Sequence, residues 1–302
     1  MLLMSSTLDA RVGTDARLLP AGLAVWVVTL VVLPAPLAAR ILLLAPLVVV
    51  PRLTVLFPAR SWTARLAGCP TLLAALPLPI AFALPTGLVA SVFALPWLAL
   101  ALSGALAAVL HGLSRLPSIL RSRQLPELGI DVALGFWAVG ASFIVVDRLG
   151  VDTGFSPAIV LLTATHFHFA GVGLLGLTSL LASSRPWLRW SVLGLIAGIP
   201  LTAVGFVLVT DAVSAIGAVL VGLSGIGAAI AMLTTPAPGH ARWLPRMAGA
   251  ALLIGMPMGI AWSVATLSGQ TFLNLDTMIR THGVLNATAV LVGVISHHAD
   301  RS

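Results

Sequence analysis

The chain has 302 residues, of which 59% are hydrophobic and only 8% are charged. About a quarter of the residues of a soluble domain are charged, so this composition excludes an ordinary water-soluble protein. The net charge of +7 arises from sixteen basic residues, all arginine, which lie singly or in pairs between apolar runs. This spacing argues against nucleic acid as a partner, because nucleic-acid binders gather their basic residues in one patch or stripe. The composition instead predicts the lipid bilayer as the partner.

Apolar runs long enough to cross a hydrocarbon core of ~30 Å follow one another along almost the whole sequence. They predict an all-α fold, a polytopic membrane bundle of about ten transmembrane helices. We expect a single transmembrane domain over 1–302, with proline-rich spans in 18–125 and the polar motifs in 126–302, since thirteen of the twenty prolines precede residue 127. The predicted spans are 18–39, 41–58, 71–90, 92–114, 129–147, 155–182, 187–208, 212–233, 244–267 and 281–298.

The first span has a second interpretation. Arg11 and Arg17, the apolar run that follows and Pro-Leu-Ala-Ala at 36–39 also fit a cleavable signal peptide. The run is long for the apolar part of a signal peptide and further spans follow it, so we favour a retained helix. Cleavage would leave the remaining topology unchanged.

The arginines predict which way the spans run. If the N-terminus and every second loop are assigned to one side, that side holds thirteen arginines, and the other holds only Arg40, Arg148 and Arg280. Because positive residues collect on the cytoplasmic side, both termini are predicted to be cytoplasmic.

The most unusual polar residues inside a span are His166 and His168, in the segment Thr163-Ala-Thr-His-Phe-His-Phe-Ala-Gly-Val-Gly173. Ionisable side chains within a membrane are costly and mark functional sites. Residues two apart on an α-helix point about 200° away from each other, so the two imidazoles cannot both bind one ion unless the helix is locally broken. His166 shares its face with small residues, and we expect it to face the protein interior.

A second polar motif, Arg280-Thr-His-Gly-Val-Leu-Asn286, opens the last predicted span. His282 and Asn286 are four residues apart and therefore lie on one helix face. Together with His166 they could form one site below the outer surface, provided that the sixth and tenth spans are neighbours. The alternative is an ordinary helix start, with Thr281 as its cap.

Two carboxylates, Glu127 and Asp131, lie four residues apart at the predicted cytoplasmic start of the fifth span. They are candidates for proton or cation binding. Acidic residues after Pro126 are also typical of the first turn of a helix, and we favour that capping role.

Signatures of soluble enzymes are missing from the sequence. It contains no Walker loop, dinucleotide fingerprint, nucleophile elbow or HExxH motif, which argues against an enzyme without settling the question. Cys69 is the only cysteine, so no internal disulfide and no thiolate cluster can form within one chain.

The stretch from Glu127 to Gly173, with Glu-Leu-Gly-Ile-Asp131 and Leu-Thr-Ala-Thr-His-Phe-His-Phe-Ala-Gly, resembles the YndJ-like family of bacterial membrane proteins. The segment His282-Gly-Val-Leu-Asn286-Ala is similar to that family's closing motif. The resemblance implies a multi-pass protein of the bacterial plasma membrane but no mechanism. Phe169 stands where the family pattern leads us to expect tyrosine. The positions that the resemblance carries over are Glu127, His166, His168, Ala170, Gly171, His282, Gly283 and Asn286.

Three functional hypotheses follow. The favoured one is a transporter-like or permease-like protein with a buried histidine site. The alternative is a membrane-embedded redox or assembly protein in which His166, His168 and His282 bind a metal or haem from different helices, although nothing in the sequence requires a cofactor. The third is a structural membrane subunit whose histidines only bond neighbouring helices. A homo-oligomer or a membrane partner is compatible with all three.

Overall fold

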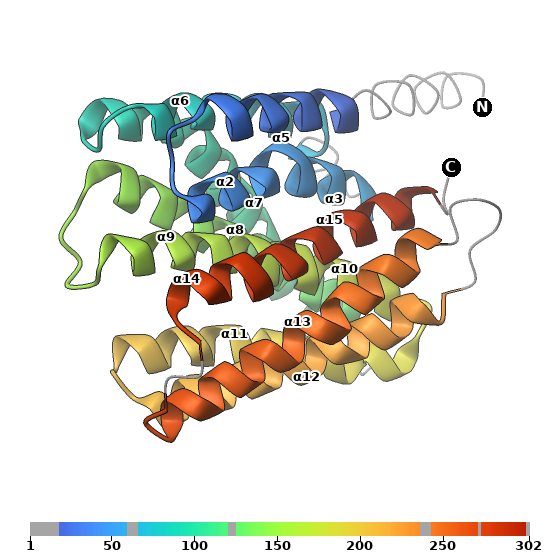
Figure 1. Ribbon diagram of the computed structural model, residues 1–302. Coiled ribbons are helices and arrows are strands. Elements are labelled where there is room, and N and C mark those ends of the chain that lie inside the picture. The colour runs from blue at the N-terminus through green and yellow to red at the C-terminus, as the bar shows by residue number, and fades with distance from the viewer. Residues whose placement is uncertain (1–17, 59–65, 120–124, 236–242, 271–272, 300–302) are drawn as a thin grey trace, which may run out of the picture.

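The computed structural model describes residues 18–58, 66–119, 125–235, 243–270 and 273–299. Within these ranges the chain is all-α and contains no strand, which confirms the predicted fold class of a polytopic helical bundle (Figure 1). Arg11 and Arg17, on which the signal-peptide interpretation depends, lie outside the described residues. The long helices are α7 (Leu88–Ile119), α8 (Leu125–Leu149), α11 (Arg189–Val207), α12 (Asp211–Leu233) and α13 (Trp243–Leu267).

Three further spans each contain a π-helical segment, in which the turns are wider than in an α-helix. The wide segment of each span is continuous with the α-helices on either side of it. The three spans pack against one another at the centre of the bundle, and Leu37–Leu56 is the most deeply buried of all. Their parts are α2 (Leu37–Leu44), η1 (Ala45–Val49) and α3 (Val50–Leu56); α9 (Pro157–His166), η3 (Phe167–Leu174) and α10 (Leu175–Ala182); and α14 (Leu275–Met278), η6 (Ile279–Gly283) and α15 (Val284–Ala299).

The remaining helices surround this centre. α7 and α8 form an antiparallel pair on one side, while α11, α12 and α13 follow one another as antiparallel neighbours on the other (Figure 1). Small residues allow α11 and α12 to approach closely: a Cβ added at Gly198 would lie 2.9 Å from the carbonyl oxygen of Gly217. In lipid, where apolar side chains gain little by leaving the solvent, such close backbone packing holds helices together.

Eight helices of the described residues are long and apolar enough to cross a membrane. They correspond to eight of the ten predicted spans. The other two predictions coincide with shorter apolar helices, Leu18–Val32 and Cys69–Ala83. Fifteen helical residues reach only ~22 Å, less than the ~30 Å hydrocarbon core, so length does not establish these two as spans. The count of ten therefore remains a prediction.

Prolines explain why the first third departs most from the expected boundaries. The first helix ends at Val32, just before Pro34 and Pro36, instead of continuing to residue 39. The third predicted span is broken into α5 (Cys69–Ala75) and α6 (Leu78–Ala83), with Pro77 between them. A proline removes a backbone donor and clashes with the preceding turn, so a helix breaks where its neighbours do not compensate.

Consecutive helices alternate in direction across the bundle (Figure 1). The helices α8, α11 and α13 end at one end of the bundle, and α7 and α10 end at the other, where α8 and α11 begin. Of the described arginines near loops, Arg115, Arg185 and Arg189 belong to the second end, as the predicted alternation requires. The side of the membrane on which the termini lie stays a prediction.

Candidate functional site

A cavity of about 300 Å³ lies between the central spans and the α11–α13 side of the bundle. Its walls come from α2, α9 with η3, α11, α12, α13 and the α14–α15 span. It occupies the end of the bundle at which α9 and α14 begin and α11 and α13 end. Most of its lining is aliphatic or aromatic, and its polar members are Thr163, Thr165, His166, Thr202, Trp262, Ser263, His282 and Asn286.

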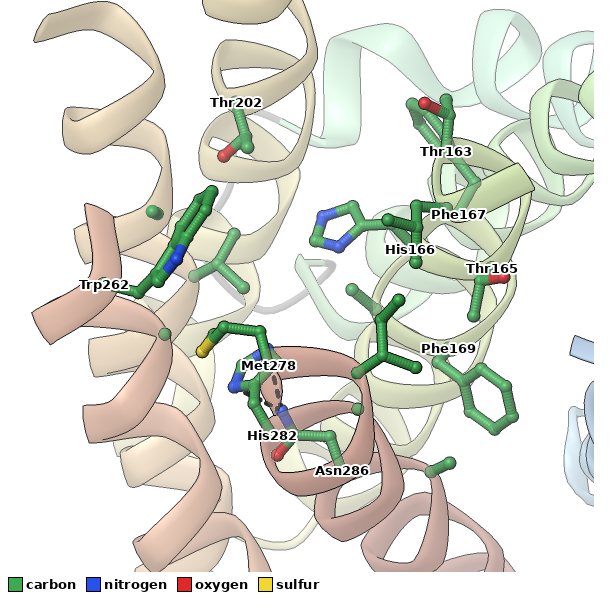
Figure 2. Close-up of a pocket in the computed structure, with 18 of the residues that line it drawn as sticks. Thr163, Thr165, His166, Phe167, Phe169, Thr202, Trp262, Met278, His282 and Asn286 are labelled. Carbon is green, nitrogen blue, oxygen red and sulfur yellow. Dashed lines mark hydrogen bonds between the residues drawn. The ribbon is translucent and has the colours of Figure 1, made fainter. Parts of the chain in front are cut away.

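The structure brings His166 and His282 into this one cavity, although 116 positions separate them in the sequence (Figure 2). His166 follows Pro157, the first residue of α9, by nine residues, or ~14 Å along a helix axis. His282 follows Leu275 by seven residues, or ~10 Å. Both rings therefore lie inside the helical part of their spans, roughly a third of the way along.

His282 is held by α13 and by its own helix. Its Nδ1 lies 2.8 Å from the carbonyl oxygen of Gly255. Because a carbonyl only accepts, Nδ1 carries the proton. The amide nitrogen of Asn286 lies 3.1 Å from Nδ1 and 3.2 Å from Nε2, and only the bare Nε2 can accept its hydrogen. The predicted one-face spacing of His282 and Asn286 thus becomes a direct contact between the two side chains, visible in Figure 2.

Two glycines on α13 make room for this pair. A Cβ on Gly259 would lie 2.7 Å from Cε1 of His282, and a Cβ on Gly255 would lie 2.4 Å from Oδ1 of Asn286. Any side chain at either position would push the polar pair away from α13. We call the recess formed by Gly255 and Gly259 the notch on α13. It was not predicted from the sequence, although Gly-Met-Pro-Met-Gly at 255–259 is a Gly-x-x-x-Gly pattern, typical of close helix packing in membranes.

His166 is different, because its ring projects from the α9 wall into the cavity (Figure 2). Its Nε2 is buried and has no hydrogen-bond partner among the described residues. The ring makes an edge-on contact with Phe167, with the centroids 6.4 Å apart. A neutral imidazole offers one donor and one acceptor, so His166 leaves hydrogen-bonding capacity facing the cavity.

His168 does not line the cavity. It is fully buried on the other side of its helix, where its Nε2 accepts from the indole Nε1–H of Trp97 at 3.0 Å and its Nδ1–H donates to the carbonyl oxygen of Ala164 at 2.8 Å. A Cβ added on Gly140 of α8 would lie 2.7 Å from Nδ1 of His168, so the lack of a side chain at Gly140 leaves the space that the ring occupies. Both nitrogens of His168 are therefore committed to structural bonds.

The structure also separates Glu127 and Asp131 from the cavity. They pair with α7: the Arg115 guanidinium donates to the Glu127 carboxylate, and Nδ1 of His111 lies 2.8 Å from Oδ2 of Asp131. His111 and Arg115 are four residues apart on α7, as Asp131 and Glu127 are on α8. Because the two helices are antiparallel, each residue of one pair faces one residue of the other. Sequence reasoning considered the acids without their partners on α7.

The three histidines proposed as a ligand set do not meet at one point, since His168 is turned toward Trp97 and away from the cavity. Among the described residues, no group of three or more His, Cys, Asp or Glu side chains is arranged to hold a metal ion. The metal or haem hypothesis therefore has no assembled ligand set in this part of the chain.

The chain matches no curated protein and no solved structure. A family model described as YndJ-like protein matches residues 40–290, which include every residue of the cavity lining except Ala38. The match covers most of the chain and agrees with the resemblance carried by the two histidine motifs. This protein therefore belongs to the YndJ-like family.

Proposed function

We propose that the protein is a transporter-like or permease-like membrane protein whose substrate binds in the cavity between His166 and the His282–Asn286 pair. The observation that carries this proposal is the ring of His166, which has no hydrogen-bond partner among the described residues and faces an apolar cavity roughly a third of the way along its span. Protein cavities that bind small molecules have volumes of ~300–1,000 Å³, mostly apolar walls and a few polar groups, and this cavity fits that description.

The alternative of a purely structural role fits two of the three histidines. His168 and His282 each bond to other parts of the protein, as structural histidines do. His166 does not, and an imidazole kept without a protein partner inside a span is costly. A ligand that bonds to it would offset that cost.

The arginine distribution and the family membership also support a location in the bacterial cytoplasmic membrane, with the cavity in the outward half of the bundle. In this arrangement the cavity would receive a substrate from outside. A second conformation, open at the other end, would release it. We treat 1–302 as one transport unit, alone or as part of a homo-oligomer.

An uptake experiment that assumes no substrate tests the proposal. Proteoliposomes that contain the full chain are incubated with a yeast extract and washed, and the accumulated small molecules are identified by mass spectrometry. Ala203→Phe places a ring in the cavity wall, whereas Val204→Phe, at the next position, points a ring away from it, since Val204 is 45% exposed.

We expect at least one compound to accumulate with the wild-type protein and with Val204→Phe, and not with Ala203→Phe, His166→Ala or protein-free liposomes. Equal accumulation by all preparations would show that the cavity carries no transport. Both variants that lack uptake are first checked for correct folding by gel filtration in detergent.

A further inference from the structure

The described cavity walls hold no fixed charge. None of the lining residues is Asp, Glu, Lys or Arg. The nearest such residues along the α14–α15 span, Asp276 and Arg280, are exposed and bond to each other at 2.6 Å. An ion that entered the cavity would lose its hydration without meeting an opposite charge, which costs far more than the burial of a neutral polar group.

Most hydrogen-bond donors of the walls are already in use. The hydroxyl of Thr163 donates to the carbonyl of Ile159, and that of Thr202 donates to Gly198. The indole N–H of Trp262 donates to Leu273 at 3.0 Å. The hydrogens of these three groups are therefore not available to a ligand, and only the lone pairs of the two hydroxyl oxygens could still accept a hydrogen bond.

Three polar groups of the walls have unused hydrogen-bonding capacity: His166, Asn286 and Ser263, whose hydroxyl bonds to no other described residue. His166 presents both a donor and an acceptor, and Oδ1 of Asn286 is a buried acceptor without a partner among the described residues. A hydroxyl group both donates and accepts, so it matches the neutral imidazole in either tautomer.

We propose that the ligand of this cavity is an uncharged molecule with an apolar body and a hydroxyl group, which bonds to His166. This inference rests on the proposed function, because it names the class of substrate for the same site. The walls select against ions by the lack of counter-charge and against plain hydrocarbons by the unsatisfied His166.

Four matched probes test the proposal: 2-naphthol, naphthalene, 2-naphthoate and 2-naphthylmethylamine, which share a ring system and differ in one group. Their binding to the full chain in phosphatidylcholine nanodiscs is measured by equilibrium dialysis, with protein-free nanodiscs as the lipid background. The variants are Ala203→Phe, Val204→Phe and His166→Phe.

We expect saturable binding of 2-naphthol, weaker by about five- to tenfold for naphthalene, which lacks the hydrogen bond, and weaker still for the two ions. Ala203→Phe should abolish binding, and Val204→Phe should preserve it. His166→Phe should remove the preference for 2-naphthol over naphthalene without abolishing the binding of either.

Equal or tighter binding of naphthalene, of the carboxylate or of the amine would overturn the proposed ligand class, as would the lack of saturable binding of all four probes. The two proposals fail separately. A charged compound accumulated in the uptake experiment would contradict the ligand class and leave transport standing, whereas cavity binding of 2-naphthol without any uptake would contradict transport alone.

Discussion

The indole of Trp97 and the imidazole of His168 are joined by a 3.0 Å hydrogen bond and lie nearly parallel, with their ring centroids 5.9 Å apart. Both side chains are fully buried, and the bond ties α7 to the π-helical segment η3. His168 therefore acts as a structural histidine, while His166, two residues earlier, faces the cavity.

Trp97→Phe should destabilise the protein by about 1–3 kcal/mol, because the buried Nε2 of His168 loses its donor. The measurement is thermal unfolding in detergent followed by fluorescence. Trp187→Phe is the control, since Trp187 is 47% exposed and its removal should change little. Similar unfolding temperatures for both variants would show that the Trp97–His168 bond adds nothing to stability.

Gly259→Ala should weaken 2-naphthol binding and destabilise the fold by about 1–3 kcal/mol, because its Cβ would lie 2.7 Å from the His282 ring. Gly135→Ala, on α8, provides the matched comparison. Its Cβ meets nothing within 4 Å, so this change should leave binding intact and raise stability by up to about 1 kcal/mol. If Gly259→Ala behaved like Gly135→Ala, the notch on α13 would not position His282.

The two acids at the start of α8 should differ in importance. Asp131→Asn should cost about 1–3 kcal/mol, since the Asp131 side chain is only 7% exposed and contacts His111. Glu127→Gln should cost less than about 1 kcal/mol, because the Glu127 side chain is 40% exposed and its ion pair with Arg115 is partly hydrated. Chemical denaturation of the two variants decides the order, and a larger loss at Glu127 would contradict it.

Single cysteines should report the orientation of the bundle. In a Cys69→Ser background, Asp152→Cys lies in the loop between α8 and α9, and Ser184→Cys lies between α10 and α11. If the cytoplasmic assignment of the termini is correct, a membrane-impermeant maleimide labels position 152 in intact cells and labels position 184 only after lysis. The reverse pattern would invert the topology.

The positions of most spans could be predicted from hydropathy alone. From residue 88 onward, each predicted span overlaps one long helix, and 212–233 differs from α12 by a single residue. The lipid environment enforces this agreement, since every backbone group within it must be satisfied by a helix. In the first third, the outcome at each proline depends on tertiary packing: η1 and α3 continue through Pro46 and Pro51, whereas the chain breaks at Pro77.

The candidate site was only partly accessible from the sequence. Spacing placed His282 beside Asn286, and the small residues near His166 indicated an interior face. The partner of His168 could not be found in this way, because Trp97 lies 71 positions away on another span. The π-helical segments were also hidden, since an expected turn of 3.6 residues cannot reveal where a helix widens.

Each wide turn accommodates one residue more than an α-helical turn would. If η3 tightened to an ordinary α-helix without losing a residue, α10 would rotate by about 100° relative to α9. His166 would keep its place, while Gly176, against which Leu53 and Phe57 pack, would turn away from them. A homologue that is one residue shorter in this segment should form an ordinary α-helix here and keep α10 in the same orientation.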